Sequence, residues 1–217
     1  MAMRASARVL RALAVFGLSV PRAEGAFAAV EEAAARRAAA RGLRCLRAAL
    51  REPGGARCIV FSGASGAGKS TALRMAARAL RRRRVRCVCA NPATLAMEKR
   101  SAVELIRGAL ADALSALARA GLSDATLLAR PARLLSDGQR WRLALALSVR
   151  RANSGRGPSV GVVIADEFCA GLDLTTACGV ARGMSGRAGA LVIAATSRED
   201  LITSMTAMPG WTVIKVQ

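Results

Sequence analysis

Residues 63–71 combine glycines, a lysine and three hydroxyl groups at a spacing that suits the binding of a phosphate chain. They match the pattern G-x-x-x-x-G-K-[ST] through Gly63, Gly68, Lys69 and Ser70. Glycines let the backbone curl until successive N–H groups point at one anion, and a following helix adds the positive end of its dipole. Lys69 would reach the outer phosphates and the Ser70 hydroxyl would bind Mg²⁺. The predicted nucleotide-binding residues here are Gly63, Ala64, Ser65, Gly66, Ala67, Gly68, Lys69, Ser70 and Thr71.

The surroundings of this stretch favour a nucleotide site over a simple Gly/Ser-rich turn. Residues 58–62 have the composition of a short buried strand and residues 71–80 that of a helix, which is the setting that the pattern requires. Only three of the 34 basic residues are lysines, and the rest are arginines. A slim ammonium group at position 69 therefore indicates a place that a guanidinium cannot fill.

Two adjacent carboxylates, Asp166 and Glu167, follow the apolar run 160–165. An acidic group at a neighbouring strand tip is what Mg²⁺ bound to a nucleotide needs, and Asp166 is predicted to supply it. Glu167 points another way and could polarise an attacking water molecule. The alternative is a pair of surface acids that end a strand. Acids are scarce in this chain, 14 against 34 basic residues, and this favours the catalytic interpretation.

Strand-like and helix-like segments alternate along the chain, which favours an α/β fold with a mostly parallel sheet and helices on both faces. Further strands are expected at 85–90, 160–165, 190–195 and 212–216, and a helix at 140–147. Apolar residues recur at steps of three and four through Val103, Ile106, Leu110, Leu114 and Leu117, which predicts one amphipathic helix closed by Gly121. Ligands of such sheets lie at the carboxyl ends of the strands, where the glycine stretch and the acidic pair also fall.

The 217 residues suffice for one α/β domain. The net charge of +20 reflects either an arginine bias or an affinity for polyanions, so nucleic acid is an open partner. The six cysteines form no C-x-x-C pair and no histidine is present, which excludes histidine-based catalysis and argues against zinc fingers. Reduced cysteines and the lack of a long apolar stretch lead us to expect a cytoplasmic protein with no transmembrane segment of its own.

Residues 1–52 are rich in alanine and arginine and contain two helix-like blocks, 4–16 and 23–51. The first has arginines on one helical face and apolar residues on the other. This pattern is typical of a transit peptide or a surface-seeking helix, but also of a helix that packs against the domain, which we favour because no convincing cleavage site follows. We expect an N-terminal helical extension over 1–52 and the main domain over 53–217.

The order of the motifs resembles that of the ABC-type ATPases. The stretch Leu135-Ser-Asp-Gly-Gln139 resembles the signature that defines that family, Ile164-Ala-Asp-Glu167 its magnesium and general-base motif, and Gly171-Leu-Asp173 the loop that follows. The resemblance implies a P-loop NTPase three-layer fold with a reduced helical arm at about 92–150. It also implies a head-to-tail homodimer, or a dimer with a related ATPase, in which Ser136, Gly138 and Gln139 contact ATP of the opposing subunit and Asp173 lines the seam. Within that family, the sequence is similar to the soluble ABC-type ATPases that are sometimes found with acetyltransferase domains.

The chain departs from that family at three places. No glutamine occurs between Gly68 and Gln139, so the glutamine loop has no counterpart, and the span from glycine loop to signature is short. The switch histidine is replaced by Ser197 or Arg198. Either could bond a γ-phosphate, and Arg198 could neutralise developing charge as an arginine finger does.

These features predict an enzyme that binds ATP and Mg²⁺ and hydrolyses ATP, with Glu167, Lys69 and Arg198 as catalytic residues and Ser70 and Asp166 as metal ligands. The alternatives are an ATP-gated binding switch that scarcely hydrolyses, the ATPase subunit of an ABC transporter, and a DNA-associated ATPase.

Overall fold

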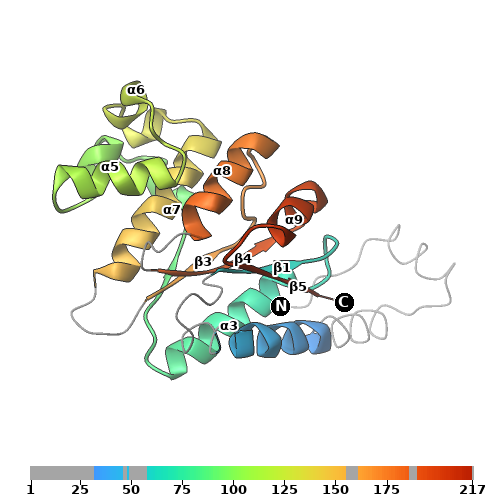
Figure 1. Cartoon of the computed structure of the whole chain (residues 1–217). Helices are drawn as coiled ribbons and strands as arrows, with labels where there is room; N and C mark the ends of the chain where they lie inside the picture. The colour runs from blue at the N-terminus through green and yellow to red at the C-terminus, as the bar shows by residue number, and fades with distance from the viewer. Residues whose placement is uncertain (1–31, 46–47, 49–57, 155–160, 186–189, 217) are drawn as a thin grey trace, which may run out of the picture.

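A computed structural model describes residues 32–45, 48, 58–154, 161–185 and 190–216. Its centre is a five-stranded sheet in the order β2-β3-β4-β1-β5, in which every pair of neighbours is parallel. The strands are β1 (Cys58–Ser62), β2 (Cys87–Cys89), β3 (Val162–Ala165), β4 (Leu191–Thr196) and β5 (Trp211–Lys215). All five coincide with predicted strands to within two residues at either end. Helices cover both faces (Figure 1), so the expected α/β three-layer fold is confirmed.

Alternate side chains of the strands enter two separate cores, because successive residues of a strand point to opposite faces of the sheet. In β1, Ile59 and Phe61 pack on one face, while Cys58 and Val60 pack on the other. Every residue of β1 is buried. A strand buried on both faces has no polar positions, which explains why the sequence shows continuous apolar runs rather than alternation.

Helix α3 (Lys69–Arg82) covers the Ile59 face of the sheet together with the helical residues 32–45. Ala34, Ala35, Ala38 and Ala39 are buried in the same apolar cluster as α3, and Figure 1 shows the two helices side by side beneath the sheet. Residues 32–45 are thus helical within the predicted helix-like block 23–51, and they pack against the domain. The block 4–16 lies outside the described residues, and the domain boundary at 52–53 stays a prediction.

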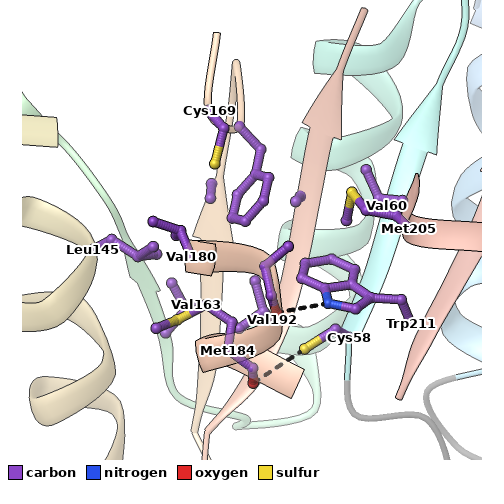
Figure 2. Close-up of a cluster of buried hydrophobic side chains, with 14 of the residues drawn as sticks. Cys58, Val60, Leu145, Val163, Cys169, Val180, Met184, Val192, Met205 and Trp211 are labelled. Carbon is purple, nitrogen blue, oxygen red and sulfur yellow. Dashed lines mark hydrogen bonds between the residues drawn. The ribbon is translucent and has the colours of Figure 1, made fainter. Parts of the chain in front are cut away.

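The opposite face is covered by α7 (Asp137–Asn153), α8 (Leu174–Ser185) and α9 (Glu199–Thr206). Figure 2 shows Cys58 of the sheet meeting Met184 of α8, where the thiol donates to the Met184 carbonyl at 3.4 Å, and Val60 beside Met205 of α9. The indole Nε1 of Trp211 donates to the Ala181 carbonyl at 2.9 Å, which satisfies the one polar group that this side chain buries.

The helical arm lies beyond α7, whose outer face it covers with a third apolar cluster. It contains η1 (Pro92–Leu95), α4 (Ala102–Leu105), α5 (Leu110–Arg119), α6 (Ala125–Leu128) and η2 (Ala132–Leu134). The prediction of one helix from Val103 to Gly121 is wrong here. Ile106 is extended and Gly108 adopts a φ of 113°, so the chain breaks between α4 and α5. Leu110 and Leu114, expected in its apolar face, are 63% and 38% exposed.

Among the described residues, no helix combines the length and the apolar character needed to cross a bilayer.

The contact between α8 and α5 predicts opposite effects of alanine at two glycines of α8. A Cβ at Gly183 would lie 2.1 Å from the Arg119 carbonyl oxygen, whereas one at Gly179 would meet nothing within 4 Å. We expect Gly183→Ala to lower the free energy of unfolding by about 1–3 kcal/mol, because the two helices must separate. Gly179→Ala should raise it by about 0.5–1 kcal/mol through helix propensity. Urea denaturation of both variants measures this, and equal effects would contradict the close packing of α8 on α5.

Candidate nucleotide-binding site

The glycine loop connects β1 to α3 and curls tightly at two glycines. Gly66 and Gly68 have φ values of 81° and 86°, a left-handed conformation that residues with a side chain avoid. Gly68 is the N-cap of α3, so the first N–H groups of that helix face the interior of the loop. The Lys69 ammonium crosses the loop and donates to the Ala64 carbonyl at 2.6 Å. The loop thus presents backbone donors and one cation to a common centre, as an anion site requires.

The predicted metal ligands meet across the sheet. Ser70 Oγ donates to Asp166 Oδ1 at 3.1 Å, although the two residues lie 96 positions apart. Both oxygens are of the hard type that Mg²⁺ binds, and Mg²⁺ usually takes one or two protein ligands and completes its shell with phosphate and water. Among the described residues, no group of three or more acidic, cysteine or histidine side chains could hold a metal by itself. The pair therefore fits a cation that arrives with a nucleotide.

Glu167 begins a strained turn directly after β3. It has a φ of 48° and Cys169 one of 59°, values that are uncommon for residues other than glycine. The turn is held at Phe168, whose N–H donates to the Ala195 carbonyl of β4 at 2.7 Å. The Phe168 ring is fully buried and lies 5.4 Å from each of the rings of Trp141 and Trp211. Glu167 is thus exposed at the carboxyl edge of the sheet, and the hydrogen bond and buried ring of Phe168 hold its backbone in place.

Burial raises the pKa of the Cys169 thiol to about 12, so this cysteine stays protonated and is no nucleophile at neutral pH.

A hollow of about 320 Å³ brings most of the predicted residues together. Its wall is formed by the glycine loop, the acidic pair and the end of β4. The lining residues include Ser65, Gly66, Gly68, Lys69, Ser70, Thr71, Asp166, Glu167 and Ser197. The remaining members of the loop, Gly63, Ala64 and Ala67, line an adjoining hollow of about 540 Å³ that shares Thr196 and Ser197 with the first. The loop therefore has accessible space on both sides.

The signature-like stretch lies at the start of α7 and forms a helix cap. Gln139 N–H donates to Ser136 Oγ at 3.3 Å, and Ser136 N–H donates to Gln139 Oε1 at 2.9 Å. This reciprocal capping box is the structural role that Ser136 offers from its residue type alone. Gly138 lies against the turn after β3, because a Cβ there would meet the Leu172 side chain at 2.9 Å. Within one chain Gly138 lines a different hollow, which it shares with Glu167.

Asp173 caps α8 in the same way, since its Oδ1 accepts from the Thr176 N–H at 2.9 Å. Hydrogen bonds from Thr176 hold the pKa of this carboxyl below its ordinary value. Asp173 is exposed, so the cap leaves the carboxylate accessible to another molecule.

The Arg198 guanidinium forms its hydrogen bonds within the protein. Its Nη1 donates to the carbonyls of Cys169, at 3.0 Å, and Leu172, and its Nε and Nη2 bond the Asp200 carboxylate at 3.1 and 2.6 Å. The guanidinium is thus turned toward the loop after β3, and Ser197 is the residue of this pair that reaches the hollow. That Arg198 neutralises charge on the phosphate stays a prediction. Two carbonyls and a carboxylate two positions away bind its donors.

Sequence reasoning missed two residues of the hollow that have polar side chains. Arg74 lines it and donates to Thr71 Oγ1 at 3.1 Å, one helical turn away. Thr196 is buried at the end of β4 and accepts from the Arg198 N–H at 3.3 Å. The spacing of Arg74 from the loop was the available signal, because residues three apart on a helix are neighbours. Thr196 carried no local signal, since its position depends on strand pairing.

Comparison with known proteins agrees with this geometry. A family model described as an AAA domain matches residues 51–168. None of the proteins of curated function matches the chain. The dimeric structure of a bacterial ABC transporter cassette is similar at a TM-score of 0.50 and 20% identity, covering 73% of this chain and 80% of that one.

Two further solved structures are similar at lower TM-scores. A bacterial Atm1-family ABC exporter with ATP bound has a TM-score of 0.49 and 14% identity, with 75% of this chain and 33% of that chain covered. The ADP conformation of an ATP-binding cassette of an ABC transporter has a TM-score of 0.46 and 14% identity, with coverages of 74% and 78%.

The fold is therefore that of the P-loop NTPases and is shared with ABC cassettes, while the family model names the AAA domain. The family model covers more than half of the 217 residues. This chain belongs to the AAA domain family of P-loop proteins.

Proposed function

We propose that this chain binds ATP with Mg²⁺ and hydrolyses it as an ABC-type enzyme, in a head-to-tail dimer of two copies. The observation that carries the proposal is the 3.1 Å hydrogen bond from Ser70 Oγ to Asp166 Oδ1 at the mouth of the glycine loop. A hydroxyl and a carboxylate at this place are the two protein ligands that a phosphate-bound Mg²⁺ needs. The association with acetyltransferase domains and a cytoplasmic location remain part of the proposal.

The predicted site residues of the hollow then divide three tasks: holding the phosphates, holding the cation and activating water. The backbone N–H groups of the loop and the Lys69 ammonium hold the phosphates, and Ser70 and Asp166 hold the cation. Mg²⁺, when bound, supplies charge that neutralises the phosphate oxygens. Glu167 accepts a proton from the water that attacks the terminal phosphate, and the Ser197 hydroxyl bonds that phosphate. Positioning and charge account for most of the rate in such transfers, which suits a site built of fixed backbone donors.

The proposed dimer completes this site with the signature of the second copy. The Ser136 oxygen accepts a hydrogen bond within the cap, but its hydroxyl proton is still available to a phosphate of the opposing subunit. Gln139 and Gly138 would lie at the same contact and Asp173 at the seam. The likeness of the fold to a cassette solved as a dimer supports this arrangement.

A binding switch that scarcely hydrolyses is the second candidate, and the position of Arg198 favours it. With that guanidinium bonded to the loop and no histidine in the chain, the terminal phosphate receives less stabilisation from the end of β4. The transporter-subunit alternative is weaker, because the glutamine loop that would couple to a permease is missing.

Phosphate release from Mg·ATP distinguishes the enzyme from the switch. We expect Glu167→Gln to lower kcat by about 10²–10⁴-fold while ATP still binds, because the variant lacks only the proton acceptor. Lys69→Ala should lose nucleotide binding as well, and Glu32→Gln, which changes an exposed glutamate that does not line the hollow, should match the wild type. Steady-state turnover and binding of a fluorescent ATP analogue test this. A Glu167→Gln enzyme as active as the wild type would disprove the assigned base, and wild-type protein that binds without turnover would favour the switch.

A charge at the signature tests the dimer. Ser136→Asp keeps a good helix cap but places a carboxylate against the phosphate of the opposing subunit. In a Glu167→Gln background, we expect ATP to produce dimers that Ser136→Asp abolishes and Ser136→Thr retains. Light scattering after size exclusion measures the mass. Dimers that persist in Ser136→Asp would mean that the signature does not face ATP.

Arg198 in this scheme is a positioning residue for the turn that carries Glu167. We expect Arg198→Gln to lower kcat by about 10- to 100-fold with less than a threefold change in KM, because misplacing a catalytic group by about 1 Å costs this much. Arg198→Lys should recover part of the loss, since an ammonium can still donate to the carbonyls. Arg182→Gln, an exposed arginine on α8, is the matched control. A rise in KM with unchanged kcat would indicate contact with ATP instead.

A further inference from the structure

One face of α3 is lined by arginines from the nucleotide hollow to the end of the helix. Arg74, Arg78 and Arg82 follow each other at steps of four residues, about 6 Å apart along the axis, and Arg81 lies beside them. All four are exposed, and the row continues into the exposed arginines at 83, 84 and 86. Ala72, Leu73, Ala76, Ala77 and Leu80 on the other face are buried against the sheet.

Within the described part of the chain, the arginines of this row form no ion pair. The sequence contains no acidic residue between Glu52 and Glu98. Among the described residues, the ion pairs involve other arginines, namely 36, 100, 140, 150 and 198. Arg74 and Arg81 donate to neutral groups, Thr71 Oγ1 at 3.1 Å and Cys89 Sγ at 3.8 Å. A straight row of exposed guanidinium groups without counter-charges favours a polyanion with regularly spaced phosphates.

We propose that this arginine face of α3 binds the phosphate backbone of double-stranded nucleic acid, without reading its sequence. A membrane is less suitable, because a helix that lies on lipid inserts an apolar face and the apolar face of α3 is already buried in the domain. A single strand is also less suitable. Phe61, Phe168 and Trp211 are buried and Trp141 is partly buried, so the described residues provide no exposed aromatic ring on which bases could stack.

A charge-matched pair of triple variants tests the proposal on the full-length protein. The first, R78Q/R81Q/R82Q, leaves Arg74 in place because that residue lines the nucleotide hollow. The second, R107Q/R119Q/R133Q, removes the same charge from exposed positions of the helical arm, on the opposite face of the sheet. Glutamine preserves helix propensity. The measurement is fluorescence anisotropy with a labelled mixed-sequence duplex between 50 and 200 mM salt.

The α3 variant is expected to lose about tenfold or more in duplex affinity at the higher salt. The slope of log affinity against log salt should become shallower by about 3, since each phosphate contact contributes about 0.9. The arm variant should change affinity less than threefold. Equal losses in both variants would overturn the proposal, because only net charge would then matter. Binding to phosphatidylserine vesicles that depends on these arginines, with unchanged duplex binding, would overturn it in favour of a membrane.

The proposal of duplex binding and the proposal of ATP hydrolysis can be tested independently. The α3 variant should retain wild-type ATP turnover and a cooperative melting transition lowered by no more than a few degrees, since Arg81 and Arg82 also offset the helix dipole; this shows that the fold and the hollow are intact. Lys69→Ala should retain duplex binding, because its ammonium lies within the glycine loop rather than on the arginine face.

Discussion

Parallel pairing of β3, β4 and β1 is the constraint on which the site depends. Ser62 pairs with Thr196, and Ala194 pairs with Ala165, so three strands end at the same edge of the sheet. The loops that follow them carry the glycine turn, Ser197 and the acidic pair. None of these segments has a local reason to approach the others, and the 3.1 Å bond between Ser70 and Asp166 exists only because the strands are in register. A shift by one residue would send every side chain of a strand to the opposite core and displace the loop that follows the strand from its neighbours.

The turn after β3 adds a second constraint, because its backbone is unfavourable by itself. Two residues with side chains in the left-handed region cost about 1–2 kcal/mol each. The cost is offset by contacts on two sides: the Phe168 ring packs between Trp141 and Trp211, and Arg198 donates to carbonyls of the turn. A strained segment held so firmly changes little when its environment changes. That property suits the role proposed for Glu167, which is to point at one water molecule, and such strain is common at functional sites.

The sequence predicts those parts of the structure that local patterns determine. The strands, the glycine loop and the acidic pair each depend on a few adjacent residues, and they lie where the patterns indicated. Helix α5 begins later than its periodicity indicates, because Gly108 adopts a positive φ that no apolar repeat reports. The partners of Arg198 could not be predicted either. Position 198 suggested a residue facing phosphate, but the competing carbonyls come from a loop 26 and 29 residues away. The residue type of Ser136 was enough to predict its capping role. A contact across a dimer depends on the second copy as well, so one chain does not determine it.

Helix α3 joins the two surfaces to which functions are proposed, and the helix dipole accounts for only part of its sequence. The positive N-terminus faces the glycine loop, where phosphate would be stabilised. Arg81 and Arg82 lie in the last turn, where a cation offsets the negative end of the dipole. Arg78 lies before that turn and gains little from it, since the effect falls off within one turn. An exposed mid-helix position accepts lysine, glutamine or glutamate equally well by helix propensity. Four guanidinium groups on one face, none of which forms an ion pair among the described residues, therefore indicate an interaction outside the fold rather than a requirement of the helix.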